Sequence, residues 1–145
     1  MLIPDLAFLL AAAFAGAAVY VAAVEQPARL ALDDSAALAQ WKPSYSRGKL
    51  MQAGLAAIGG ALALWVWWVG RDPLWLAGGL LLLASWPFTI LVILPTNHKL
   101  EATHADAPTG ETRALLVRWG NLHLVRAAFG VASVLAMLAA LQLRP

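Results

Sequence analysis

Hydrophobic residues gather in four long runs along the chain, at positions 6–24, 51–69, 74–94 and about 119–141. Each run approaches the ~20 residues that a helix needs to cross ~30 Å of hydrocarbon. Inside a bilayer every backbone N–H and C=O must be bonded within its own segment, so the runs are predicted to be helices rather than strands. We therefore expect an all-α fold, an integral membrane four-helix bundle of up-down-up-down order, in which residues 1–145 form one transmembrane domain.

The composition agrees with lipid as the main solvent. Of the 145 residues 61% are hydrophobic and 12% are charged, and the mean hydropathy is +0.72. A soluble domain of this size needs far more charge to cover its surface. The net charge of +2 is small and scattered, which argues against a nucleic-acid partner. The lack of cysteine excludes disulfides, thiolate metal sites and cysteine nucleophiles.

The start of the chain and the basic residues together predict an orientation. Asp5 precedes the first run, and no lysine or arginine does. The basic segment of a signal peptide is therefore missing, and we expect a retained helix. The connections after the first and third runs hold most of the basic residues, whereas the opposite side holds only Arg71 and Arg144. By the positive-inside rule the two long connections are cytoplasmic and both termini lie outside. We expect a bacterial inner (plasma) membrane protein. The basic residues of the long connections are Arg29, Lys42, Arg47, Lys49, Lys99, Arg113 and Arg118.

Two prolines are expected to interrupt helices. Asp34 or Ser35 can cap a short helix in the first long connection, and Pro43 would end that helix. Pro87 lies inside the third run, where it removes a helical hydrogen bond and should kink the helix.

Small residues recur at four-residue spacing on several runs. In lipid such stripes let helix backbones approach closely. We predict that they pack helices within one protomer, with a homo-oligomer contact as the alternative. Two of these stripes are Ala56/Gly60 and Ala128/Ala132/Ala136/Ala140.

A histidine and an arginine stand at the start of the last run, in "WGNLHLVR". At 100° per residue, Trp119, His123 and Arg126 fall within an arc of about 60° on one helical face. Ionisable groups of this kind are costly against lipid, so we expect the face to point into the bundle near its cytoplasmic end. Other polar and aromatic residues belong to the same end of the bundle. They are Glu25, Arg29, Trp41, Tyr45 and Asn97.

Each of these polar residues also has a purely structural interpretation. Glu25 and Arg29 can form an i,i+4 pair at a helix end. Arg126 can neutralise Glu25 or reach the cytoplasmic headgroups. Asn97 can be a C-terminal cap. His123 is the hardest to explain in this way, because a neutral imidazole in a membrane helix is suited to act as a base.

A second group of histidines suggests a metal site, but only weakly. His98, Glu101 and His104 in "NHKLEATHAD" have suitable side chains, yet the spacing spreads them over more than half a helical turn. The segment also has the composition of a solvated loop. We therefore expect no metal site there. The chain has no Walker loop, GxGxxG, HExxH or nucleophile elbow.

The order of the short motifs "EQPARL", "WKPSYSRGKLMQA", "LPTNHKLE" and "W-x-x-x-H-x-x-R" resembles the anthrone-oxygenase-like family of small four-helix membrane proteins. The resemblance covers the chain from position 25 to position 126. It implies oxidation of an apolar aromatic molecule, an anthrone, by O2 to a quinone without a metal or flavin cofactor. The matching positions are Glu25, Arg29, Trp41, Tyr45, Pro95, Asn97, Trp119, His123 and Arg126.

The resemblance also suggests a role for each matching residue. His123 would be the base, and Arg126 and Asn97 would stabilise the enolate oxygen. Glu25 would orient His123 or balance the charge of Arg126. The expected substrate-binding residues are Trp41, Tyr45, Trp119 and Arg29, the aromatic ones by stacking on a flat ring.

Two other classes of function stay open. The polar end could bind an amphiphile or carry protons, but the outer half of the bundle is almost purely apolar, which disfavours transport. The protein could also be a non-enzymatic accessory or binding protein in membrane lipid, in which the polar residues only lock the helices together.

Overall fold

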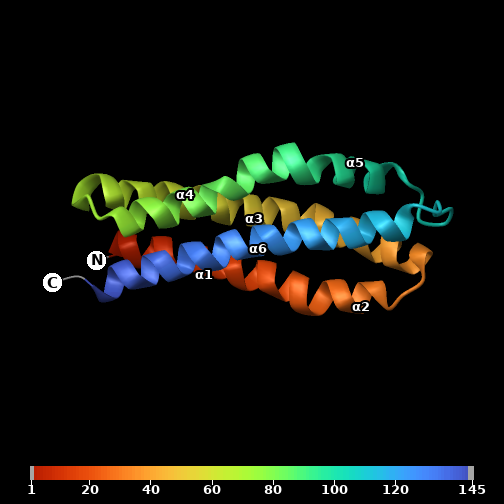
Figure 1. Ribbon diagram of the computed structural model, residues 1–145, viewed down its shortest axis with the longest axis horizontal. Helices are drawn as coiled ribbons and strands as arrows, with labels where there is room; N and C mark the ends of the chain where they lie inside the picture. The colour runs from red at the N-terminus through yellow and green to blue at the C-terminus, as the bar shows by residue number, and fades with distance from the viewer. Residues whose placement is uncertain (1, 144–145) are drawn as a thin grey trace.

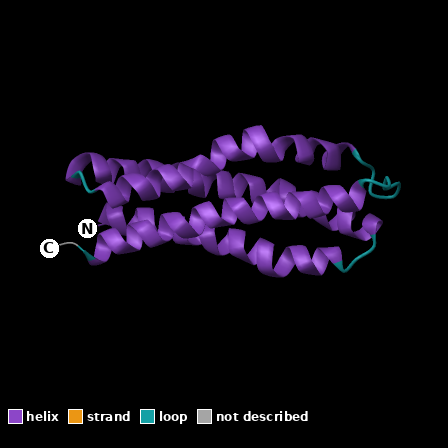
Figure 2. Cartoon of the chain, viewed as in Figure 1, coloured by secondary structure: helices purple, strands orange, loops and turns teal. Residues whose placement is uncertain are grey.

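The computed structural model describes residues 2–143 as a bundle of four long, antiparallel helices with no strand in that part of the chain (Figure 1, Figure 2). All four are long and apolar enough to cross a membrane. The first comprises α1 (Leu2–Tyr20), η1 (Val21–Glu25) and α2 (Gln26–Leu30), and the second is α3 (Asp34–Gly70). The third comprises α4 (Pro73–Phe88), η2 (Thr89–Ile93) and α5 (Leu94–Ala102), and the fourth is α6 (Thr112–Gln142).

The helices follow the up-down-up-down order predicted from the four hydrophobic runs. α1 packs against α3 and α6, and α4 packs against the same two helices from the other side. The beginning of α1, the end of α6 and the α3–α4 turn share one end of the bundle, and the two longer connections share the other (Figure 1). Two basic residues were predicted on the side opposite the long connections. Arg71 lies in the short turn with a φ of 57°, and Arg144 is outside the described residues.

The first long connection differs from the prediction. Pro43 does not end a short helix, because α3 runs without a break through it. The N-cap is Asp33, whose side chain accepts a hydrogen bond from the Ala36 N–H at 2.9 Å. Leu38 and Trp41 on this part of α3 are fully buried in a hydrophobic cluster with residues of α5 and α6. That packing holds the segment helical despite the hydrogen bond that proline removes.

Two π-helical turns change the hydrogen-bond register of the first and third helices. η1 ends two residues before Pro27, and η2 ends two residues before Pro95. Because each proline lacks an N–H, the wider turn before it accommodates the carbonyl that would otherwise be left unpaired. The predicted change of direction near Pro87 is present, since the ribbon bends between α4 and α5 (Figure 1). The π turns were not predicted.

Small residues let the helices approach closely, but only some at the predicted positions. Ala56 and Gly60 are buried, and a Cβ at Gly60 would lie 2.5 Å from Leu83 Cγ. On α6, however, Ala140 is the one buried member of the predicted stripe, since Ala128 is exposed and Ala132 and Ala136 are half-buried. The buried face there carries Ala127, Gly130, Ser133, Met137 and Ala140.

The interior is divided into two hydrophobic clusters. One occupies the end of the short turn and includes Phe14, Trp75 and Leu82. The other lies toward the long connections and includes Leu100 and Leu116. Between them, at the level of α3 residues 44–53, the helices leave space for a pocket.

Candidate functional site

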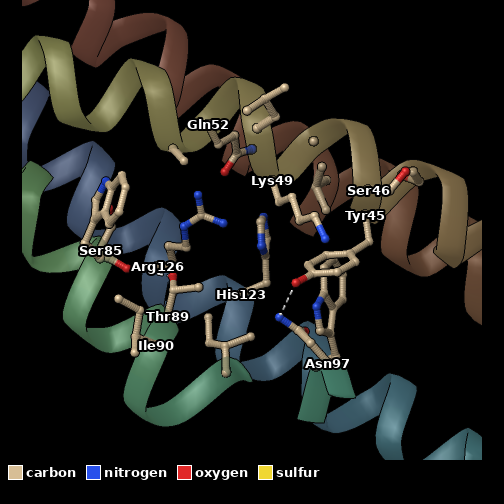
Figure 3. Close-up of a pocket in the computed structure, with 18 residues that line it drawn as sticks. Tyr45, Ser46, Lys49, Gln52, Ser85, Thr89, Ile90, Asn97, His123 and Arg126 are labelled. Atoms are coloured by element: carbon tan, nitrogen blue, oxygen red, sulfur yellow. Dashed lines mark hydrogen bonds between the residues drawn. The ribbon is translucent and has the colours of Figure 1, made fainter. Parts of the chain in front are cut away.

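A pocket of about 460 Å³ lies between the two hydrophobic clusters, lined mainly by α3, by α4 with η2 and α5, and by α6 (Figure 3). Its wall is mostly apolar, with a small number of polar groups that converge on it, which is typical of small-molecule sites. The lining residues are Val21, Ser44, Tyr45, Ser46, Gly48, Lys49, Leu50, Gln52, Ala53, Ser85, Trp86, Thr89, Ile90, Ile93, Asn97, Trp119, His123 and Arg126.

The predicted face of α6 points into this pocket. Trp119, His123 and Arg126 all line it, one helical turn apart. The ring of His123 stacks on that of Trp119, with ring centroids 5.1 Å apart and planes inclined by 16°. His123 is only 4% exposed, and its Nε2 has no hydrogen-bond partner among the described residues. A buried polar atom without a partner is costly, so it marks a place where a ligand would supply the missing bond.

Arg126 is held by packing rather than by a carboxylate. Its guanidinium lies over the ring of Phe14, 5.2 Å from the centroid. In the described part of the chain its Nε has no hydrogen-bond partner, and no ion pair there includes Arg126. The suggestion that Arg126 neutralises Glu25 is therefore wrong. Its donors remain available to a ligand.

Asn97 is fully buried within α5 and is not a C-terminal cap, because that helix continues to Ala102. Its Nδ2 donates a hydrogen bond of 2.9 Å to the Tyr45 hydroxyl (Figure 3). Its Oδ1 has no partner among the described residues. The unsatisfied atom of Asn97 is thus an acceptor, and the Tyr45 oxygen, which accepts from Asn97, keeps its own O–H hydrogen free to donate.

Gln52 completes the polar set and was not singled out from the sequence. It is 3% exposed, and its Oε1 lacks a partner in the part of the chain that the structure describes. In Figure 3 its side chain points from α3 toward Arg126 and His123. The residue was visible as the glutamine of the "MQA" motif, a polar side chain at the start of an otherwise apolar run. Four unpartnered polar atoms therefore meet in one apolar pocket, from Gln52, Asn97, His123 and Arg126.

Comparison with known proteins assigns this architecture to a family. A family model described as anthrone oxygenase matches residues 41–136, which include most of the pocket. The chain belongs to the anthrone oxygenase family. It is also similar to the anthrone oxygenase tpcL of Aspergillus fumigatus, with 54% identity over 46 residues. That match covers 30% of this chain and 29% of the relative, so the chain spans less than a third of that protein. No solved structure matches the chain.

Three of the predicted site residues do not line the pocket of this family member. Trp41 is fully buried behind it, stacked on Tyr45 at 4.7 Å and meeting Trp119 edge-on at 5.9 Å. It supports the two aromatic rings of the pocket wall rather than presenting its own face. The other two residues, Glu25 and Arg29, form a separate polar cluster.

Arg29 is the centre of that cluster, and its side chain is 1% exposed. It donates hydrogen bonds to Glu25 at 2.5 Å and to Gln40 at 2.5 Å, and it also bonds Gln26. Its guanidinium lies over Trp119, 5.3 Å from the ring centroid. The i,i+4 interpretation of Glu25 and Arg29 is therefore confirmed. No hydrogen bond joins Glu25 to His123 among the described residues, since its bonds go to Arg29, Gln40 and Ser44.

The histidines of the second long connection do not gather into a ligand set. His98, Glu101 and His104 are exposed, and the described residues contain no group of three or more His, Cys, Asp or Glu that could hold a metal ion. Glu101 instead lies 3.6 Å from Lys49 in a solvent-exposed ion pair.

Proposed function

We propose that this protein is a membrane-embedded oxygenase that oxidises an anthrone-like or quinone-like aromatic molecule with O2, without a bound cofactor. The observation that carries the proposal is the unpartnered Nε2 of His123, held in an apolar pocket with Arg126 and the ring of Trp119. The family match and the activity named for the Aspergillus relative support the same class of reaction.

His123 is the base. Because the backbone carbonyl of Ala18 lies within bonding range of the imidazole, a bond from Nδ1–H to that carbonyl would leave the lone pair on Nε2. Nε2 is the ring nitrogen without another partner. It is therefore the atom that would take a proton from a ligand.

The chemistry needs only a base, a stabilised enolate and O2. Nε2 removes one proton from the acidic methylene of the anthrone, and the electron pair of that C–H bond delocalises onto the carbonyl oxygen. The enolate passes one electron to O2, and the superoxide and substrate radical then combine through a new C–O bond. The imidazolium returns its proton to the peroxide. Removal of the second methylene proton breaks the O–O bond and gives a quinone and one water.

The remaining polar atoms divide into donors and acceptors. Arg126 and the free O–H of Tyr45 would stabilise the enolate oxygen. Gln52 Oε1 and Asn97 Oδ1 would accept hydrogen bonds from hydroxyl groups on the rim of the substrate. In this assignment Tyr45 takes over the donor role that the sequence suggested for Asn97. His123 and Arg29 cover the indole of Trp119, and Trp41 and Lys49 cover the phenol of Tyr45. These two rings would therefore border the flat ring system with their edges.

We also propose an orientation of the bundle in the membrane. The pocket is nearer to the end of the bundle that carries the basic connections, so the site would open near the cytoplasmic face with both termini outside. The membrane would be the plasma membrane, which in a bacterium is the inner membrane.

A non-enzymatic accessory or small-molecule-binding role is the second candidate. The Arg29 cluster favours it, because its polar side chains lie at the same end of the bundle and bond one another across the first and second helices, which locks these helices together. The two candidates differ in one respect: only the oxygenase consumes O2 and forms a new C–O bond.

Isotope labelling tests the proposal. The purified protein is supplied with a simple anthrone under ¹⁸O2, and the quinone is analysed by mass spectrometry. The oxygenase reaction places one ¹⁸O atom in the quinone at a rate above that of the protein-free reaction. Saturable binding of the anthrone with no product above that background would overturn the oxygenase and favour the binding role.

A further inference from the structure

The rim of the pocket is formed by one pair of helices. Leu50 of α3 is 79% exposed, and Trp86 and Ile90 of α4 and η2 are 43% and 53% exposed, although all three line the pocket. The residues at its floor, such as Asn97 and His123, are buried. The pocket therefore opens through the flank of the bundle, between α3 and η2, and not along the bundle axis.

The packing of α3 and α4 explains why an opening forms there. Closer to the short turn the two helices touch, because a Cβ at Gly60 would lie 2.5 Å from Leu83 and one at Gly79 would lie 3.0 Å from Leu64. Beyond that contact the third helix changes to the π turn η2 and bends (Figure 1). On the facing side of α3 the lining residues include the small Gly48 and Ala53, which leave space between the helices.

The depth of this opening in the bilayer follows from the number of residues between it and the short turn. At 1.5 Å per residue, Ile90 lies about 26 Å along its helix from Pro73, and Leu50 lies about 30 Å along α3 from Gly70. A hydrocarbon layer of ~30 Å that starts near the turn, where exposed Trp65 and Trp68 lie, therefore reaches the opening. Lys49 and Ser46 on the same rim fall at the level of the headgroups.

We propose that the ligand of this pocket enters sideways from the adjacent lipid leaflet, through a portal between Leu50 on one lip and Trp86 and Ile90 on the other. The ligand class is then an apolar ring compound already dissolved in the bilayer, and the polar atoms at the floor receive it after it has left the lipid. The proposal rests on the proposed function for the identity of the ligand, and on the position of the opening for the route.

The chain offers a direct test because it contains no cysteine. Ala53→Cys places a single thiol in the pocket wall of protein reconstituted in liposomes. Two reagents are compared: an apolar aromatic maleimide that partitions into the bilayer, and a sulfonated maleimide confined to water. The apolar reagent is expected to label Ala53→Cys at least tenfold faster, after correction for the rate of each reagent with the unfolded chain.

A second substitution then closes the portal. Ile90→Trp is expected to slow labelling by the apolar reagent about tenfold, and Leu50→Trp, on the opposite lip, should do the same. Leu124→Trp is the matched control, since Leu124 is 59% exposed on α6 and does not line the pocket. It should leave the labelling rate unchanged. Thermal unfolding in detergent checks that each double variant is folded.

Three results would overturn the portal: equally fast labelling by the sulfonated reagent, no effect of either rim tryptophan, or no labelling of folded Ala53→Cys by either reagent. Labelling requires no turnover. A protein that labels as expected but consumes no O2 would support the portal and refute the oxygenase. A protein that consumes O2 but does not label as expected would support the oxygenase and refute the portal.

Discussion

The indole of Trp119 lies nearly parallel to the imidazole of His123, with ring centroids 5.1 Å apart. Arg29 covers the indole at 5.3 Å from the ring centroid, so a cation, an indole and an imidazole lie in sequence from the polar cluster to the pocket. The indole contacts the face of the imidazole and so holds the orientation of its plane. The edge of the ring that carries Nε2 has no hydrogen-bond partner among the described residues.

Trp119→Leu is expected to lower turnover by about tenfold, because the imidazole loses the ring that holds its plane and a base must be well aligned with the proton it removes. Trp119→Phe keeps an aromatic face and should lose less. The ratio of the two turnover numbers, measured on folded protein, checks the point. Equal rates in Trp119→Leu and the wild type would contradict a positioning role for the stack.

Tyr45→Phe removes the hydroxyl that accepts a hydrogen bond from Asn97 Nδ2. The fully buried Asn97 side chain then has no hydrogen-bond partner at Nδ2 or at Oδ1. We expect the free energy of unfolding in mixed micelles to fall by about 1–3 kcal/mol. Ser46→Ala is the control, since the Ser46 hydroxyl bonds only the Pro43 carbonyl of its own helix at an exposed position. A loss no larger than that of the control would mean that the hydrogen bond contributes little.

Arg29→Ala should destabilise the protein by about 3 kcal/mol or more, because it leaves the buried Gln26 and the half-buried Glu25 without their common donor. Lys49→Ala breaks an exposed ion pair and should cost less than about 1 kcal/mol. Unfolding of both variants in the same detergent provides the comparison. Similar losses in the two variants would argue against the cluster as a helix lock.

Gly120→Ala tests the contact between the first and last helices. A Cβ there would lie 2.7 Å from Gln26 Nε2, which donates to the Leu116 carbonyl at 2.8 Å. Gln26 would have to move and lose that bond, at a cost of about 1–3 kcal/mol. Gly54→Ala meets nothing within 4 Å and should be neutral or stabilising by about 0.5–1 kcal/mol. Thermal unfolding that ranks the two variants in the opposite order would contradict the packing described for Gly120.

The sequence predicted the helices and one face of the site for simple reasons. The four hydrophobic runs correspond to the four long helices, since length and hydropathy leave a membrane segment few alternatives. Helical periodicity was sufficient to place His123 and Arg126 on the buried face of the last helix.

Other parts of the site depend on contacts between distant segments. Gln52 is one polar residue among many near a membrane boundary, and only the packing of α3 against α6 makes it part of the pocket. The sequence left Glu25 with two possible partners, Arg29 and Arg126, because a count along the chain does not tell which of two nearby cations it meets, and the structure pairs it with Arg29. The π turns and the unbroken passage of α3 through Pro43 result from tertiary packing that overrides local preference.

Oxygen uptake is the direct test of His123 as the base of an oxygenase that needs no cofactor. Detergent-purified protein is given a simple anthrone, and the wild type is compared with His123→Gln, which keeps a polar side chain of similar length, with and without a chelator. We predict that His123→Gln lowers uptake by about 100-fold or more while remaining folded, and that the chelator has no effect on the wild type. Uptake retained in folded His123→Gln, or no uptake above the protein-free rate in the folded wild type, would contradict this prediction.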